Sequence, residues 1–228
     1  MNNIHIKPLL ALLITTLLSC QGFSQLAPAD FDAATTGKPV QVLDVRSFDN
    51  FKAGHIPHAM QADWGNQTQF TSQAQYLDKD KPVYVYCADG AATKAAAGWL
   101  RSNGFGSVFE LTGGFAKWKE AGKATEVLDA KAMTAADVTA ATSGSGITLV
   151  SVGGENPGGR KTDAVLQWLA RDMSGKYKLV KIEGGISADL MTQLKATIPT
   201  LILYQNGKEV WRKQGAVELE ELEKEVSR

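Results

Sequence analysis

One cysteine stands where a strand is expected to end and a helix to begin. Cys87 follows the run 82–86 (PVYVY), whose β-branched and aromatic residues predict a strand, and a helix is expected over 93–102. Such a loop points backbone N–H groups inward, and the helix start adds positive potential. This position favours the thiolate form of Cys87 and can hold an anion beside the sulfur. The alternative interpretation is that Cys87 is a buried cysteine without chemical function.

The amino terminus has the pattern of an export signal. Lys7 precedes an apolar run over 9–18, which is too short to span a bilayer but has the length of a signal-peptide core. The run ends in Leu-Leu-Ser-Cys at 17–20, which resembles the lipobox of bacterial lipoproteins and implies that Cys20 is acylated. The alternative is an ordinary signal peptide cut near Gln25. Residues 1–20 are therefore assigned to a signal peptide.

The chain has two cysteines, Cys20 and Cys87. If Cys20 is acylated its sulfur is blocked, and if cleavage falls after it the residue is removed. Either way Cys87 keeps the single free thiol of the mature protein, so an internal disulfide is excluded. The three histidines are scattered along the sequence and, with one thiol, give no spacing typical of a metal site. The net charge is zero, so the sequence gives no sign of a basic surface that would bind nucleic acid. No cofactor is expected.

Strand and helix patterns alternate from residue 26 onward, which predicts an α/β protein. Strands are expected at 39–45, 82–86, 108–111, 147–152, 178–182, 201–204 and 209–211, and later helices at 134–141, 162–174 and 217–226. Asn206-Gly207 predicts a hairpin turn. A stretch rich in Ala and Thr after Gly122 indicates a boundary, so the domains are placed at 26–123 and 128–228.

Three ordered motifs in the first domain resemble the rhodanese family. They are LDVR at 43–46 with GHIPHA at 54–59, the loop residues Cys87, Gly90 and Thr93, and LTGGF at 111–115 with Trp118. The resemblance implies a parallel-sheet fold and persulfide exchange, in which a cysteine takes sulfur from a donor such as thiosulfate and passes it to a thiol acceptor. Cys87 is then the nucleophile. The substrate-binding backbone is that of Ala88, Asp89, Gly90, Ala91, Ala92 and Thr93.

The loop departs from the family pattern at its charges. Ala92 stands where the family usually has arginine, and Asp89 adds a negative charge. A charge-assisted bond to an anionic donor is therefore missing, which favours a neutral or protein-bound sulfur donor over thiosulfate. Asp44 and Arg46 are interpreted as a structural ion pair and His55 as a hydrogen-bonded structural residue, with substrate binding and general-base catalysis as their alternatives.

The second domain resembles the carboxyl-terminal half of thioredoxins, through IPTLILY at 198–204 followed by Asn-Gly-Lys. The resemblance implies that Pro199 is the family's cis proline. The redox Cys-X-X-Cys is absent, since 155–161 reads ENPGGRK, so dithiol exchange is excluded. Three roles remain: partner binding in the groove beside Pro199, anion binding at Arg160 and Lys161, or structural support of the first domain. Partner binding is favoured.

Together these features predict an exported sulfurtransferase or persulfide carrier with one nucleophilic thiol and a redox-inactive thioredoxin-fold domain that binds a partner. Its expected place is the cell envelope, as a membrane-anchored lipoprotein facing the periplasm or, without the anchor, as a soluble periplasmic protein. The other hypothesis is a catalytically silent envelope adaptor.

Overall fold

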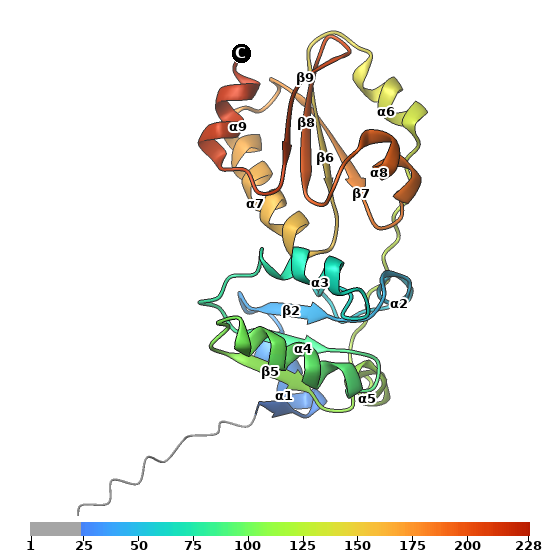
Figure 1. The fold of residues 1–228 in the computed structure, drawn as a ribbon, viewed down its shortest axis with the longest axis vertical. Helices are drawn as coiled ribbons and strands as arrows, with labels where there is room; N and C mark the ends of the chain where they lie inside the picture. The colour runs from blue at the N-terminus through green and yellow to red at the C-terminus, as the bar shows by residue number, and fades with distance from the viewer. Residues whose placement is uncertain (1–23) are drawn as a thin grey trace, which may run out of the picture.

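The computed structural model describes residues 24–228, which form two α/β domains (Figure 1). The N-terminal domain contains β1 (Gln25–Leu26), α1 (Pro28–Thr35), β2 (Gln41–Asp44), α2 (Phe48–Ala53), β3 (Met60–Gln61), α3 (Gln67–Ala74), β4 (Val83–Tyr86), α4 (Ala91–Ser102), β5 (Val108–Leu111) and α5 (Gly114–Glu120). Its five strands run in the order β1-β5-β4-β2-β3, and all four pairings are parallel.

The C-terminal domain is built on a mixed sheet. It contains α6 (Ala135–Thr142), β6 (Ile147–Gly153), α7 (Pro157–Asp172), β7 (Lys178–Glu183), α8 (Ala188–Leu194), β8 (Thr200–Gln205), β9 (Lys208–Gln214) and α9 (Leu219–Val226). The strand order is β7-β6-β8-β9, with β6 and β7 parallel and the other pairs antiparallel. The alternating strands and helices of both domains confirm the α/β class. The hairpin at Asn206-Gly207 is also confirmed, because both residues have positive φ and join the antiparallel strands β8 and β9.

One helix begins earlier than the sequence pattern predicts. We expected it over 162–174, but α7 starts at Pro157. Asn156 caps it by accepting a hydrogen bond from the Gly159 N–H at 2.8 Å, and proline suits the first helical position. The two glycines at 158 and 159, which read as a turn, therefore lie in the first turn of the helix.

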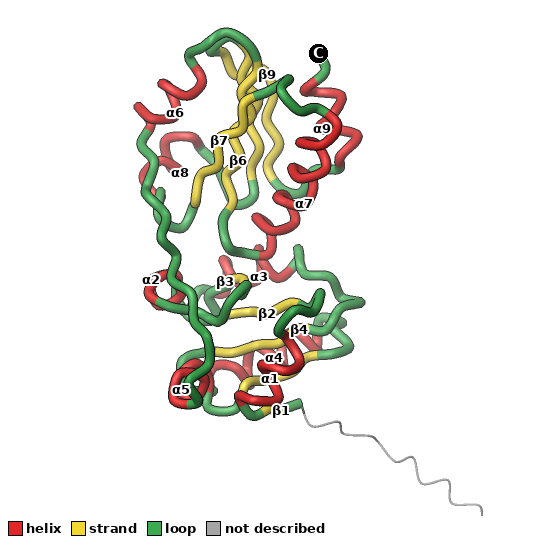
Figure 2. The backbone as a smooth tube through the Cα atoms, turned by 180° about the vertical axis from the view of Figure 1, so that it is seen from behind, coloured by secondary structure: helices red, strands yellow, loops and turns green. Residues whose placement is uncertain are grey.

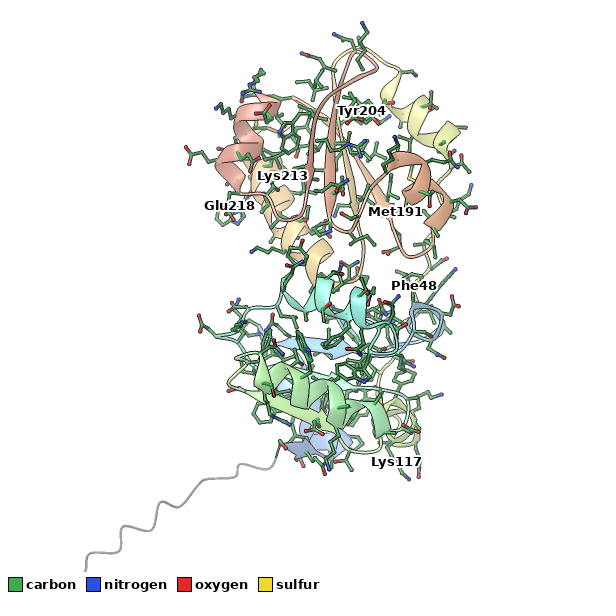
Figure 3. The ribbon with its side chains drawn as sticks, viewed as in Figure 1. Phe48, Lys117, Met191, Tyr204, Lys213 and Glu218 are labelled. Atoms are coloured by element: carbon green, nitrogen blue, oxygen red, sulfur yellow. The ribbon has the colours of Figure 1, made fainter. Side chains whose placement is uncertain are left out.

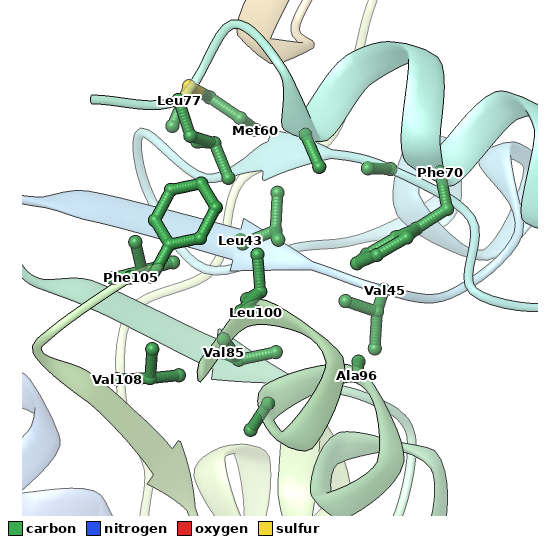
Figure 4. Close-up of a cluster of buried hydrophobic side chains, with 14 of the residues drawn as sticks. Leu43, Val45, Met60, Phe70, Leu77, Val85, Ala96, Leu100, Phe105 and Val108 are labelled. Carbon is green, nitrogen blue, oxygen red and sulfur yellow. The ribbon is translucent and has the colours of Figure 1, made fainter. Parts of the chain in front are cut away.

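The N-terminal sheet is buried on both faces, as expected of parallel strands covered by helices. All four residues of β4 are buried. On one face, Leu43 and Val85 pack against Ala96 and Leu100 of α4, while Phe70 of α3 joins the same cluster (Figure 4). This core fixes β4 and α4 relative to each other, and the loop that joins them carries Cys87.

The segment 121–134 joins the two domains and runs along one side of the molecule to α6 (Figure 2). His55 and Glu126 form an isolated antiparallel bridge that fixes its first part to the N-terminal domain. The predicted domain limits of 26–123 and 128–228 remain a prediction.

The two domains meet through α3, whose Gln73 bridges them. The Gln73 side chain donates to the Ile198 carbonyl at 3.0 Å and accepts from the Gly158 N–H at 3.1 Å. Nearby, the Gln61 N–H donates to the Glu155 carbonyl at 2.7 Å. Phe48 lies at this boundary (Figure 3), against the backbone of Gly185. Gln73 is 3% exposed, so its bonds are made away from water.

Replacing Gln73 by alanine should weaken this interface. The Ile198 carbonyl and the Gly158 N–H would both lose their partner, and an unsatisfied buried group costs about 1–3 kcal/mol. We expect the free energy of unfolding, measured by urea denaturation, to fall by about that amount. Gln75→Ala is the matched control, because Gln75 is exposed and bonds only within α3 and its end. Equal stability of the two variants would contradict the assigned role.

A cavity of about 230 Å³ lies at the same boundary and contains Glu183. Burial raises the pKa of Glu183 to about 7, and the negative charges of Glu155 and Asp163 also raise it, while backbone N–H groups including that of Gly185 act in the opposite direction. The folded protein therefore binds a proton here over a pH range in which the unfolded chain has released it.

The contribution of Glu183 to stability should accordingly fall as the pH rises from about 4.5 to about 7, because the folded state binds more protons at this group than the unfolded state in that window. Glu183→Gln removes this titration, so the variant should gain about 1–3 kcal/mol over the native chain as the pH rises through that range. Urea denaturation at several pH values measures this. A difference between the two proteins that stays constant with pH would contradict the assignment.

Candidate functional site

Cys87 follows the last residue of β4 directly, as predicted. Its side chain is 3% exposed, and the Gly90 N–H donates to Sγ at 3.1 Å. Gly90 has φ of +96° and caps α4, which begins at Ala91. Only a residue without Cβ adopts this backbone readily, so glycine at 90 lets the chain turn around the sulfur. The predicted strand, loop and helix are present, but α4 begins at Ala91 rather than at 93, so the last three residues of the predicted binding loop lie in its first turn.

The loop places one charge beside the thiol. Asp89 Oδ1 lies 3.8 Å from Sγ and accepts a hydrogen bond from the Ala91 N–H at 2.9 Å. Thr93 is buried, and its Oγ1 has no hydrogen-bond partner among residues 24–228. Of the other residues predicted to supply binding backbone, Ala88 lies in the loop and is exposed, whereas Ala91 (exposed) and Ala92 (half-buried) lie in the first turn of α4. The site thus places a donor N–H and a carboxylate at one sulfur, and the first turn of the following helix holds a buried hydroxyl without a partner among the described residues.

The amino end of α5 holds the loop from the other side. The Phe115 N–H donates to the Cys87 carbonyl at 2.8 Å, and the Ala116 N–H donates to the Ala88 carbonyl at 2.9 Å. Gly114 makes this approach possible, since a Cβ there would lie 2.5 Å from the Cys87 carbonyl oxygen and 2.7 Å from the Asp89 nitrogen. The sequence showed Gly113-Gly114 only as part of a motif, and its contact with the loop was not anticipated.

Gly114→Ala should displace the cysteine loop. The new Cβ would overlap the loop backbone, which adds overpacking of about 1–3 kcal/mol to the cost of a left-handed conformation. Gly122→Ala is the matched control, because Gly122 has a similar φ of +66° and open space around it. We expect a larger loss of stability and a changed rate of Cys87 alkylation only in the first variant. Indistinguishable variants would contradict the contact's importance.

Asp44 and Arg46 form the predicted ion pair beneath the site. The Arg46 guanidinium bonds the Asp44 carboxylate at 2.5–3.0 Å and donates to the Gly54 carbonyl at 2.7 Å. It also lies 4.2 Å from the ring centre of Phe115. Both side chains are buried, at 8% and 0% exposure, and their polar groups are used within the protein. This geometry agrees with a structural role.

His55 is likewise held by the protein. Its Nδ1 lies 2.9 Å from the Phe51 carbonyl, its ring stacks on Phe51, and its Nε2 is 3.9 Å from the Glu126 carboxylate. The structure therefore shows His55 engaged with α2 and the connecting segment. The structural interpretation fits these contacts better than that of a general base for Cys87.

The Ile198–Pro199 peptide bond is cis, and Pro199 is buried. The groove expected beside it is filled by the N-terminal domain: Gln73 bonds the Ile198 carbonyl, and a Cβ at Gly158 would touch both Pro199 and Tyr76. Our preference for a partner in this groove does not fit the structure. Sequence reasoning missed Gln73 because a glutamine in a polar helix gives no interface signal.

Anion binding at the start of α7 is also disfavoured. The Gly158 N–H is bonded to Gln73, and the Gly159 N–H is bonded to Asn156. Arg160 is paired with Glu155. The two backbone N–H groups and part of the Arg160 guanidinium are thus used within the protein, which favours structural support of the N-terminal domain. Arg160 Nε has no hydrogen-bond partner and Lys161 is exposed without an ion pair among residues 24–228, so anion binding by these two side chains remains a prediction.

Several expectations concern other parts of the chain. Cys20 and the signal segment lie outside the described residues. Within residues 24–228, no helix is long and apolar enough to cross a membrane. The same residues contain no group of three or more His, Cys, Asp or Glu side chains suited to a metal ion.

A parallel α/β sheet that presents a thiol at the start of a helix defines a domain suited to thiol chemistry. Residues 27–121 match the family model described as "Rhodanese-like domain". A protein named thiosulfate sulfurtransferase GlpE from Shewanella oneidensis is 36% identical over 99 residues, which cover 43% of this chain and 95% of that protein. The chain therefore belongs to the rhodanese-like family.

Two further similarities involve the same domain. A protein of the same name from Coxiella burnetii is 34% identical over 82 residues, covering 36% of this chain and 74% of the relative. Among solved structures, the Alr3790 protein from Anabaena is 34% identical, with a TM-score of 0.41, covering 46% of this chain and 83% of that one.

Proposed function

We propose that this protein is a sulfurtransferase or persulfide carrier whose nucleophile is Cys87. The observation that carries the proposal is the loop itself, in which the Gly90 N–H donates to Sγ at 3.1 Å. A backbone donor in this place stabilises negative charge on sulfur, both in the thiolate and in the persulfide that replaces it. The names of the relatives with 36% and 34% identity support the same reaction class.

The reaction has two transfers. The Cys87 thiolate attacks the outer sulfur of a donor, a new S–S bond forms, and the donor's own bond to that sulfur breaks. The donor leaves with the electron pair, as sulfite from thiosulfate or as a thiolate from a persulfide. An acceptor thiolate then attacks the outer sulfur and releases the Cys87 thiolate. The transferred sulfur has the same oxidation state in the donor, in the Cys87 persulfide and in the product. The two transfers therefore require no external oxidant, metal or cofactor.

Incubation with a persulfide donor should add one sulfur atom to the protein. Intact-mass spectrometry should show this addition on the native chain and its loss on treatment with a thiol acceptor. Cys87→Ala should show neither, since the described residues contain no other cysteine. Absence of the addition from the native chain with every donor tried, or equal addition to the variant, would reject the proposal.

A silent adaptor is the second candidate function. It is favoured by Ala92, which leaves the loop without the arginine usual in the family, and by the carboxylate of Asp89 beside the sulfur. The mass experiment separates the two candidates, because an adaptor would fold normally and acquire no sulfur.

We further propose that the C-terminal domain is thioredoxin-like and redox-inactive. The sheet order, the antiparallel β8–β9 hairpin and the cis peptide before Pro199 support this assignment. The stretch of 155–161 has no cysteine. Because Gln73 occupies the edge beside Pro199, the partner of this domain within the chain is the N-terminal domain. Any other protein partner would bind elsewhere on it.

Export to the cell envelope, with a lipid on Cys20, completes the proposal. Lys7, the apolar run 9–18 and the sequence Leu-Leu-Ser-Cys support it. In this setting the chain would face the periplasm and exchange sulfur with donors and thiols there.

Cell fractionation tests the two parts of the localisation separately. Cys20→Ala should move the protein out of the membrane fraction, and an unchanged distribution would reject the lipid anchor. An uncleaved amino terminus in the cytoplasmic fraction would reject export.

A further inference from the structure

The active loop contains a negative charge of its own, held in a defined place. Asp89 Oδ1 lies 3.8 Å from Cys87 Sγ and accepts the Ala91 N–H at 2.9 Å. The carboxylate is therefore fixed by the loop backbone rather than free to turn away. It also takes up an N–H group at the start of α4 that would otherwise be available to an oxygen of an incoming anion.

No cation neutralises this carboxylate among the residues that the structure describes, since Asp89 takes part in no ion pair there. Arg46 is buried and bonded to Asp44. Lys117, on the neighbouring α5 and labelled in Figure 3, is paired with Glu120 at 2.7 Å. Lys94 is exposed on α4, and Ala92 brings no charge at all.

We propose that the Asp89 carboxylate makes Cys87 selective for sulfur donors and acceptors that carry no negative charge next to the sulfur, with cationic aminothiols and their persulfides preferred. The inference rests on the proposed function and names its substrate class. An anion that approached Sγ would meet a fixed negative charge within about 4 Å of its target. An ammonium group on the same path would be attracted instead.

The Cys87 thiolate attacks the outer sulfur of R–S–SH, a new S–S bond forms to Cys87 Sγ, and the S–S bond of the donor breaks. RS⁻ leaves with the electron pair, and the proton stays on the new persulfide or passes to RS⁻. The leaving thiolate is formed close to Asp89, so a positive charge on R stabilises the transition state as well as the encounter.

The test uses three small persulfides that differ in charge, made from aminoethanethiol, mercaptoethanol and mercaptopropionate, together with thiosulfate. Second-order rates of Cys87 loading are measured by intact mass for the native mature protein, in which Cys87 is the single free thiol, and for its Asp89→Asn variant. The amide oxygen of asparagine can still accept the Ala91 N–H, so the loop turn is kept while the charge is removed. For each donor, the rate of Asp89→Asn is divided by the rate of the native protein. This ratio removes the differences in leaving-group reactivity between the donors.

Removing the carboxylate beside Sγ favours the Cys87 thiolate for every donor, so the rate with the neutral persulfide serves as the reference. Relative to that reference, we expect Asp89→Asn to load about tenfold faster than the native chain with thiosulfate and more slowly with the cationic persulfide. These differences should shrink at high salt, because Asp89 is exposed to solvent. Asp89→Ala, which also frees the Ala91 N–H, should be faster still with thiosulfate. Asp80→Asn, an exposed carboxylate before β4, should match the native rates.

Equal effects of Asp89→Asn on all four donors would overturn the inference, as would a native preference for the anionic donors. Either result would leave the proposed function standing, because Cys87 would still be loaded. Failure of every donor to load the native chain and both Asp89 variants would instead reject the proposed function itself.

Discussion

The site depends on a pair of hydrogen bonds between the start of α5 and the cysteine loop. The Phe115 and Ala116 N–H groups hold the carbonyls of Cys87 and Ala88. Because these carbonyls are directed toward α5, the loop turns at Gly90 and places the Gly90 N–H against Sγ. The close approach of the two segments exists only because residue 114 has no Cβ. Without this contact we expect the sheet to remain folded, but the loop would no longer hold the Gly90 N–H against the Cys87 sulfur.

Much of this arrangement could be predicted from the sequence, and the reasons are local. The apolar run before Cys87, the glycine at 90 and the helical pattern after it define the strand, turn and helix without reference to the rest of the chain. The same holds for α6, where Thr134 and Asp137 form a capping box, and for the hairpin at Asn206-Gly207. Each of these elements is fixed by residues close in sequence.

The parts that could not be predicted depend on contacts between distant residues. α3 is polar apart from Phe70 and Ala74, so its pattern gave no helix, yet Gln73 of α3 bonds backbone groups 85 and 125 positions away. A polar side chain that satisfies buried backbone groups has no periodic signature. For the same reason the sequence suggested an open groove beside Pro199, whereas the structure fills it with the neighbouring domain. The charge at Asp89 was visible in the sequence, but its fixed position beside the sulfur was not.

The proposed function requires the loop around Cys87 to stabilise an anionic sulfur. A crystal structure of the protein after loading with a persulfide donor tests this most directly. We expect a second sulfur bonded to Cys87 Sγ, within hydrogen-bond distance of backbone N–H groups of 88–93 or of the Thr93 hydroxyl, with the rest of the loop unchanged. A second sulfur that pointed away from these donors, or a loop that had to unfold to admit it, would contradict the account.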